Sequence, residues 1–447
     1  MPVFAIHSRR TLTPGGIKDA TVIISNGLIT EVIGGLPVDF NYELIDIDNK
    51  VLMPGVIDPH VHINEPGRTD WEGFDTATKA AVTGGITMLV DMPLNSSPVT
   101  TTAVAFDEKI NSARVQLHTN CGFWGGIIPG NENEIERLIE KGVLGFKAFL
   151  IHSGIDEFPN VKEADLRRTM PLIAKHDLPL LVHCELADGR PLATGQSRSY
   201  ANYLASRPRD WEDKAIALMI RLCREYNCRT HIVHLSSASS IDQIAKAKQD
   251  GLPLTVETGQ HYLYFSAEKI SDGQTQYKCA PPIREKVNNE RLWLALKDGI
   301  IDFVATDHSP ALPSMKELES GDFMKAWGGI SSIQFSLPAL WTAAKQHNCD
   351  LTDIIKWLCE KPALLTGKEK TNGKIEKGFD ADLIVWDPEK SFYVTEEIIQ
   401  HKHKITPYIN EKLYGEIEQT YLKGEKVFDK GKFLHLNKGR IITNNKK

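Results

Sequence analysis

Two histidines with metal-binding spacing lie in the segment IDPHVH at residues 57–62. Alternate side chains of a β-strand project to the same side, so His60 and His62 would face one cavity. Neutral imidazole nitrogen is a preferred ligand of zinc and of other transition metals. The spacing therefore favours a metal-chelating pair, although two solvent-facing histidines would give the same pattern.

Four further apolar runs contain or precede a single residue that could do chemistry. Lys147 interrupts the run GFKAF, His183 closes LLVH, His234 closes IVH and Asp307 follows VAT. A buried ammonium is costly unless it is paired, neutralised or chemically modified. Each residue also has an ordinary explanation: a buried ion pair for Lys147, structural histidines, and a helix cap for Asp307.

The elements that would position these residues are short apolar runs, each followed by a segment of helical periodicity. Such runs include GITMLVDMP, GVLGFKAFLI, LPLLVHCE, THIVHLSS, LPLTVETG and DFVATDHSP. The alternation is typical of parallel strands, and about eight such units predict a closed (β/α)8 TIM-like barrel of the α/β class. Catalytic groups sit at the C-terminal strand ends of such barrels. Six metal-competent or base-competent groups at five strand ends therefore favour one shared site over coincidence.

The two ends of the chain have a different, β-rich texture. The run ATVIISNGLITEVIGG alternates apolar and polar residues around the turn Asn26-Gly27, and NGKIEKGFDADLIVWD with residues 421–427 repeats this texture. We expect residues 1–52 and 368–447 to pair as a small β-sandwich domain, and residues 53–367 to form the barrel. The polar tail ITNNKK is expected to be a loose end.

Composition and charge exclude several function classes. Hydrophobic residues at 41% and charged residues at 25% are typical of a globular chain, which excludes disorder and fibres. A net charge of −6 gives no general attraction to nucleic acid. Seven scattered cysteines argue against a disulfide scaffold. No apolar run is long enough for a membrane span and the N-terminus lacks a signal-like segment, so we expect a cytoplasmic protein with no membrane partner.

The motifs together resemble the cyclic amidohydrolases, the superfamily of dihydropyrimidinase, dihydroorotase and allantoinase. The resemblance covers VLMPGVIDPHVH, the lysine run, both later histidine runs, TDHSP and GKIEKGFDADLIVWD. Within the superfamily the sequence is most similar to the allantoinase branch, through HINEPGRT, WEGF, DMPLNSSP, GFWGGIIPGN, SGIDEFP, KCAPPIR and WGGISSIQ. These long motifs exclude a chance match.

The resemblance implies two zinc ions per subunit and one modified lysine. His60, His62 and Asp307 would hold one ion, His183 and His234 the other, and Lys147, carboxylated on its side-chain nitrogen by carbon dioxide, would bridge them. Asp307 would accept the proton of the attacking water and return it to the leaving nitrogen. The implied reaction is hydrolytic opening of allantoin to allantoate in purine catabolism, by a homotetramer or homodimer.

Two departures from related enzymes bear on the substrate. Asn64 stands where dihydroorotases carry an arginine that binds a carboxylate, which suits an uncharged ureide better than an acid. His152 stands where dihydropyrimidinases place a tyrosine, so we expect it to contact substrate, against the alternative of an exposed loop histidine.

The loop KCAPPIR resembles the family segment whose backbone contacts the ring, which implicates Cys279 and Ala280. Gly328 and Gly329 would approach the opposite side of a flat ring, although a plain tight turn would also explain them. Two alternative functions stay open: a hydantoinase or dihydropyrimidinase acting on related cyclic amides, and a non-catalytic scaffold protein of the same family.

Overall fold

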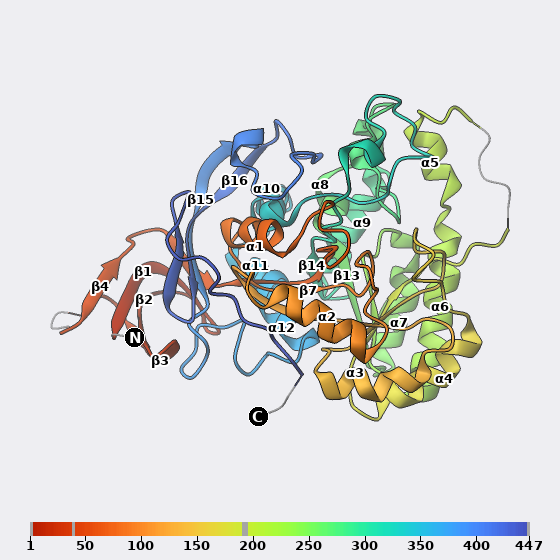
Figure 1. Ribbon diagram of the computed structural model, residues 1–447. Helices are drawn as coiled ribbons and strands as arrows, with labels where there is room; N and C mark the ends of the chain where they lie inside the picture. Colours follow the sequence, from red (N-terminus) through yellow and green to blue (C-terminus); the bar gives the residue numbers. More distant parts are fainter. Residues whose placement is uncertain (1–2, 38–40, 190–194, 445–447) are drawn as a thin grey trace.

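The computed structural model describes residues 3–37, 41–189 and 195–444. Figure 1 shows a barrel with helices around it, and beside it a β layer to which both ends of the chain contribute. The predicted barrel with a small β domain is therefore confirmed.

The barrel consists of parallel strands that follow one another in chain order around a ring. The strands are β6 (Val56–Val61), β7 (Ile86–Asp91), β8 (Asn120–Phe123) continued by β9 (Gly125–Gly126), β10 (Phe146–Phe149), β11 (Leu180–His183), β12 (Thr230–Ile232), β13 (Leu254–Gly259) and β14 (Phe303–Ala305). A parallel bridge between Val61 and His308 joins the last strand to the first. Almost all strand residues are buried, as expected for parallel strands covered on both faces.

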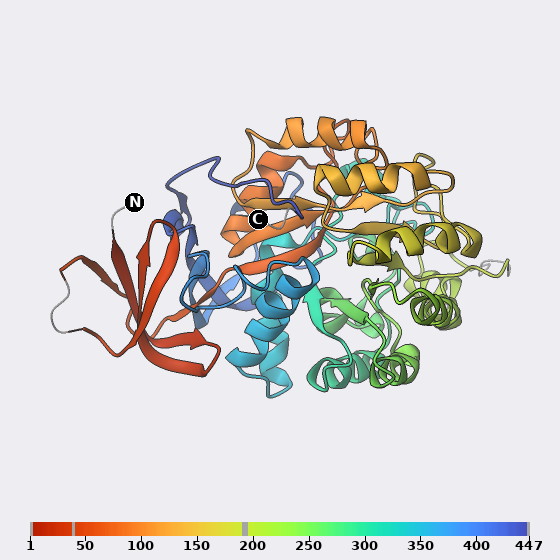
Figure 2. The same ribbon diagram turned by 90° about the horizontal axis from the view of Figure 1, so that it is seen from below.

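Helices form the outer layer, as the view in Figure 2 shows. They are α1 (Phe74–Thr83), α2 (Ala103–Ala113), α3 (Ile135–Lys141), α4 (Glu163–Ala174), α5 (Tyr200–Ser206), α6 (Arg209–Tyr226), α7 (Ile241–Gln249), α8 (Gln260–Tyr264), α9 (Lys286–Lys297), α10 (Ser336–Gln346), α11 (Leu351–Ile355) and α12 (Lys361–Leu365). In α6, the buried residues Trp211, Ala215, Met219 and Leu222 recur every three or four positions. This spacing gives the helix one apolar face toward the strands.

The terminal segments share one nine-stranded sheet. Its strands are β1 (Phe4–Thr13), β2 (Gly16–Ser25), β3 (Leu28–Gly34), β4 (Glu43–Asp46), β5 (Val51–Pro54), β15 (Leu383–Tyr393), β16 (Lys412–Leu422), β17 (Glu425–Asp429) and β18 (Lys432–Phe433). The antiparallel pair of β5 and β15 joins the N-terminal strands to the C-terminal ones. Ile6, Val22, Leu383 and Val385 belong to one buried apolar cluster, so both segments share a core.

The turn Asn26-Gly27 joins β2 to β3, and both residues have positive φ, at 52° and 80°. These angles fit the tight hairpin turn predicted from the sequence.

The expectation of a loose C-terminal tail is wrong for residues 442–444, and the pairing begins one residue earlier. Ile441 forms a parallel bridge with Cys121, and the Ile442 amide donates to the Cys121 carbonyl at 2.9 Å. The Asn444 amide donates to the Gly142 carbonyl at 3.1 Å. The tail thus continues the barrel sheet at β8, and its backbone hydrogen bonds outweigh its polar composition. The last three residues of ITNNKK lie outside the described residues.

In the described ranges, no helix combines the length and the apolar character that crossing a membrane requires.

Candidate metal centre and substrate cavity

The first group of candidate ligands is His60, His62 and Asp307. Their ligand atoms all lie within 4.8 Å of one another. The Asp307 Oδ1 atom is 3.2 Å from His60 Nε2 and 3.4 Å from His62 Nε2. The strand β6 supplies the histidines and the segment after β14 supplies the carboxylate, so neighbouring strand ends bring the three together.

The second group is His183 at the end of β11 and His234 just after β12. Their ring centroids are 4.6 Å apart, and the His234 ring is 5.4 Å from that of His60. Lys147, within β10, is fully buried, and its Nζ lies 5.0 Å from the centroid of the Phe149 ring. The structure therefore brings five predicted ligands around one cavity, with the lysine buried behind it.

Several nitrogens of this cluster are ready to bind a metal. His62 Nδ1, His234 Nδ1 and Lys147 Nζ are buried and have no hydrogen-bond partner among the described residues. Buried polar atoms without a partner are costly, and a metal bound by the cluster would offset that cost. Imidazole nitrogens with a carboxylate are also a donor set that zinc accepts. The residues present therefore fit a metal centre.

Burial sets the protonation of this cluster. It lowers the pKa of His62 to about 4 and that of Lys147 to about 8. Burial would also lower the pKa of His60, but the charges of Glu257 and Asp307 raise it to about 9. Burial opposes the charge of Asp307, yet His60 and its neighbours hold the pKa of that carboxyl well below its usual range. The cluster therefore holds a carboxylate beside an imidazole that stays neutral at physiological pH.

Backbone strain marks two of these positions. His234 and Asp307 have φ of 38° and 46°, in the left-handed region that residues other than glycine rarely adopt. Such strain persists only where the surroundings fix it, and it is common at active sites.

Buried carboxylates hold the histidines from behind. Glu257 bridges His60 Nδ1 and His231 Nε2, the latter at 3.1 Å. Glu185 accepts from Arg207 Nε at 3.0 Å and lies 2.7 Å from His183 Nε2. A carboxylate on one ring nitrogen fixes the ring orientation and leaves the other nitrogen for a ligand.

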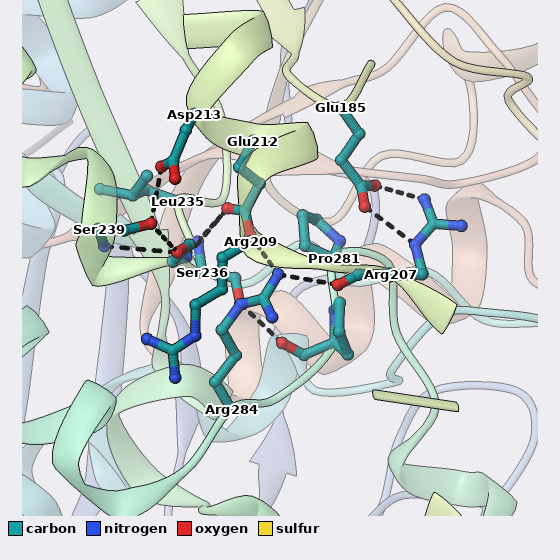
Figure 3. Close-up of polar contacts among 12 residues, drawn as sticks. Glu185, Arg207, Arg209, Glu212, Asp213, Leu235, Ser236, Ser239, Pro281 and Arg284 are labelled. Atoms are coloured by element: carbon teal, nitrogen blue, oxygen red, sulfur yellow. Dashed lines mark hydrogen bonds and ion pairs between the residues drawn. The ribbon is translucent and has the colours of Figure 1, made fainter. Parts of the chain in front are cut away.

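A further buried ion pair joins the segment after His234 to the loop before α9 (Figure 3). Glu212 Oε2 accepts from the Ser236 amide at 3.1 Å, and Arg284 Nη2 donates to Glu212 Oε1 at 2.6 Å. Arg284 also donates to the Arg207 carbonyl at 3.2 Å. This network connects Arg207, which holds Glu185 behind His183, to Ser236 in the segment after His234.

One cavity of about 470 Å³ opens over the histidines. Of the substrate contacts predicted from the sequence, His152, Ala280, Gly328 and Gly329 line it. Sequence reasoning did not single out Asn95, Tyr203, Arg207, Lys278 and Trp327, which also line it. Asn95, Lys278 and Trp327 lie within motifs quoted above, whereas Tyr203 and Arg207 lie in none of them, and none of the five follows a strand-end pattern.

Asn64 and Cys279 are not part of the cavity lining. Asn64 is fully buried, and its Nδ2 donates to the Pro310 carbonyl at 3.1 Å. Cys279 is buried and its carbonyl accepts from the Tyr203 hydroxyl at 2.5 Å. Both residues therefore support the cavity from outside its surface.

His152 lies at the rim of the cavity, with 58% of its side chain exposed. Its Nδ1 accepts from the Gly154 amide at 3.1 Å, and its Nε2 is 3.3 Å from Asp156 Oδ1. The ring is thus held by its own loop and still faces the cavity.

The loop of residues 278–284, here called the 278–284 wall, borders the cavity through Lys278 and Ala280. Side-chain hydroxyls donate to four of its backbone carbonyls. The donors are Tyr203 to Cys279, Tyr262 to Pro281, Ser236 to Pro282 and Tyr200 to Ile283, at 2.5, 2.7, 2.6 and 2.6 Å. Ala280 lies between the held carbonyls and lines the cavity.

Residues 324–329 form a second wall, the 324–329 wall. A Cβ on Gly328 would lie 3.9 Å from the Ala280 nitrogen, so the two walls face each other closely. A Cβ on Gly329 would lie 2.3 Å from the Ser309 carbonyl oxygen, so only glycine fits there. The two walls therefore approach each other at Ala280 and Gly328, where neither residue carries a large side chain.

Known proteins resemble this chain over nearly its whole length. A family model described as the amidohydrolase family matches residues 51–427. The allantoinase of Streptomyces avermitilis is 45% identical over 442 residues, which covers 98% of each chain. The allantoinase of Saccharomyces cerevisiae is 39% identical over 444 residues, 96% of each chain.

Solved structures support the same relationship. The L-hydantoinase (dihydropyrimidinase) of Arthrobacter aurescens superposes with a TM-score of 0.92 at 29% identity, covering 99% of this chain and all of that one. The dihydropyrimidinase of Brevibacillus agri gives 0.89 at 26% identity over both full chains. From the matched segment, the full-length relatives and the shared architecture, we conclude that the chain belongs to the amidohydrolase family.

Proposed function

We propose that this protein is an allantoinase, which opens the hydantoin ring of allantoin by hydrolysis to give allantoate in purine catabolism. The observation that carries the proposal is the convergence of imidazole and carboxylate groups on one cavity, beside a buried lysine. The surrounding sequence is 45% identical to an allantoinase over nearly its whole length.

The proposed metal ligands fall into two groups. His60, His62 and Asp307 would hold one zinc ion, and His183 and His234 a second. When bound, such ions lower the pKa of a coordinated water toward about 7 and polarise a substrate carbonyl.

Lys147 is the proposed bridge between the two groups, as a carbamate. Burial lowers its pKa to about 8, so an appreciable fraction of its amine is neutral near physiological pH. A neutral amine can attack carbon dioxide: an N–C bond forms and one amine proton leaves. The resulting anion would supply the oxygen ligand that an apolar strand otherwise lacks.

Asp307 is the proposed proton carrier. Its low pKa keeps it ionised, so it can accept the proton of the attacking water as the oxygen–carbon bond forms. It returns that proton to the ring nitrogen as the carbon–nitrogen bond breaks. The ring opens to a carboxylate and a ureido group, without a redox step.

The cavity suits a small flat ring. Its volume of about 470 Å³ is typical of small-molecule sites. We propose that Ala280, Gly328 and Gly329 contact the ring through their backbones, and that His152 contacts it at the rim. Cys279 would act through the 278–284 wall, and Asn64 through the segment at Pro310 to which it donates. The proposed assembly is a homotetramer or homodimer.

A second candidate is a hydantoinase or dihydropyrimidinase. The TM-score of 0.92 with the Arthrobacter L-hydantoinase favours it, since the same scaffold there carries that title.

Substrate profiling separates the two candidates. The purified protein is prepared with zinc and bicarbonate, and ring opening of allantoin, hydantoin, dihydrouracil and dihydroorotate is followed in parallel with bound metal. Allantoin turnover with near-background rates on the other rings is the expected result. Preference for hydantoin or dihydrouracil would contradict the proposed substrate but would agree with the proposed metal site. Bound metal without turnover on any ring would favour the non-catalytic scaffold.

A further inference from the structure

Two buried lysines beside the cavity have no part in the proposed chemistry. Lys278 is 9% exposed and Lys316 is 4% exposed. In residues 3–37, 41–189 and 195–444, no carboxylate forms an ion pair with either ammonium. An unpaired buried ammonium is costly, so its position calls for a compensating set of contacts.

Lys316 ends the short 3-10 helix η5 (Pro313–Lys316) and reaches the 324–329 wall. Its Nζ donates to the Trp327 carbonyl at 3.0 Å and to the Gly329 carbonyl at 2.8 Å. One side chain thus holds the wall on both sides of Gly328.

Lys278 reaches the same wall from the opposite loop. Its Nζ donates to the carbonyls of Ala326 and, at 3.3 Å, Met324. The same nitrogen lies 5.2 Å from the centroid of the Tyr203 ring, and the Lys278 carbonyl accepts from the Gly329 amide at 2.8 Å. Lys278 therefore joins the 278–284 wall to the 324–329 wall.

The 324–329 wall contains no helix or strand, so its carbonyls lack the partners that regular structure supplies. The two lysines contact four of its carbonyls, at Met324, Ala326, Trp327 and Gly329. Charged donors make stronger hydrogen bonds to carbonyls than neutral ones. The cost of burying each ammonium is thus partly offset by ordering a loop that forms the cavity surface.

We propose that Lys278 and Lys316 are positioning residues for the ring substrate, because they hold the 324–329 wall at the distance from Ala280 that the ring requires. The inference rests on the proposed function only in taking a cyclic amide as the occupant. Lys316 is not part of the cavity lining and acts through the wall backbone, whereas Lys278 holds the same wall and also lines the cavity. A wall that binds ground state and transition state equally affects KM and leaves kcat unchanged.

The test compares Lys316→Met with Lys404→Met. Lys404 is not among the residues that line the cavity, and its Nζ also donates to two backbone carbonyls, those of Ile399 and His401. Loss of the Lys316 donors should raise KM by about tenfold with kcat within about twofold. Lys404→Met should leave both constants unchanged. Lys278→Met is the second variant, with KM expected to change in the same direction.

Hydrogen exchange gives a readout that needs no turnover. The amides of Trp327 and Gly329 donate to the carbonyls of Met315 and Lys278, and they report on the order of the wall. In ligand-free Lys316→Met these amides should exchange at least several-fold faster than in the native protein, with unchanged metal content. In Lys404→Met they should keep their native protection.

The outcomes separate the inference from the proposed function. If the native protein opens another ring but not allantoin, the proposed substrate is wrong. The KM comparison of the lysine variants is then made with the ring that the protein does open. Native KM and native exchange in both Lys316→Met and Lys278→Met would overturn the inference, whichever ring is opened. A fall in kcat with unchanged KM would also overturn it, because it would place the lysines in the chemical step.

Discussion

The two halves of the cavity are built in different ways. On the metal side, the histidines and Asp307 lie at strand ends, and buried carboxylates such as Glu257 and Glu185 hold the rings of His60 and His183. On the substrate side, the surface is loop backbone, and hydroxyl and ammonium groups hold its carbonyls. Side chains thus make one half and main chain makes the other.

This difference assigns the chemical step to one half of the cavity and the fit of the substrate to the other. Groups on strands are held more rigidly than groups on loops, which suits ligands that must keep a fixed geometry. Loops over a rigid scaffold vary more easily, which suits the choice of substrate. We therefore expect changes on the metal side to affect kcat and metal content, and changes on the wall side to affect KM.

The largest effect is expected from Asp307→Asn. The amide cannot accept the proton of the attacking water, so kcat should fall by at least about 1,000-fold. Ring-opening assays with metal analysis measure this effect. Turnover within tenfold of the native rate would contradict the role of Asp307 and with it the chemical half of the comparison.

A smaller effect on the same side is expected from Glu257→Gln. The His60 ring loses the charge that orients it, so zinc affinity or activity should fall by about 10- to 100-fold. Zinc titration of the metal-free variant and of native protein measures the difference. Native affinity and native kcat together would show that the carboxylate does not position the ring.

On the wall side we expect Tyr203→Phe to raise KM by about three- to tenfold, because the Cys279 carbonyl loses its donor. The matched control is Tyr277→Phe, whose hydroxyl donates to the Pro407 carbonyl at 3.3 Å away from the cavity lining. The control should behave like native protein. A loss of kcat without a change in KM in Tyr203→Phe would contradict the claim that the wall side affects substrate binding and not the chemical step.

The smallest effect is a pH dependence of wall order. Burial lowers the pKa of Lys316 to about 7; Cys279 opposes this shift and Lys278 adds to it. An opened wall would return the ammonium to its ordinary pKa in water, so opening takes up a proton and becomes less favourable as pH rises above 7. Exchange of the wall amides, corrected for intrinsic rates, should therefore slow between pH 6 and 9 in native protein. Lys316→Met should show a smaller slowing, because Lys278, whose pKa burial lowers to about 8, still holds the wall. An identical profile in both proteins would contradict the assignment.

The metal side could be predicted from the sequence because its signals are local. A polar residue that ends an apolar run, as His183 and His234 do, marks a strand end, and a barrel brings strand ends together. The family resemblance added the pairing of these residues into two groups.

The substrate side could not be predicted in the same way. Asn64 was expected to contact substrate, yet its side chain is buried against Pro310, and nothing local in the sequence indicates this. Lys316 carries no motif, because its role depends on carbonyls of a distant loop. The strand β8 was also missed, since glycines interrupt its apolar run NCGFWGG.

A zinc titration tests whether this protein is a hydrolase that needs two metal ions. Metal-free protein is titrated with zinc in the presence of bicarbonate while allantoin opening and bound zinc are followed together. The proposed function predicts that turnover rises with zinc and saturates at two ions per chain, and that Lys147→Met neither binds the full complement of zinc nor turns over allantoin. Full turnover without added zinc, or full zinc binding and native turnover in Lys147→Met, would contradict it.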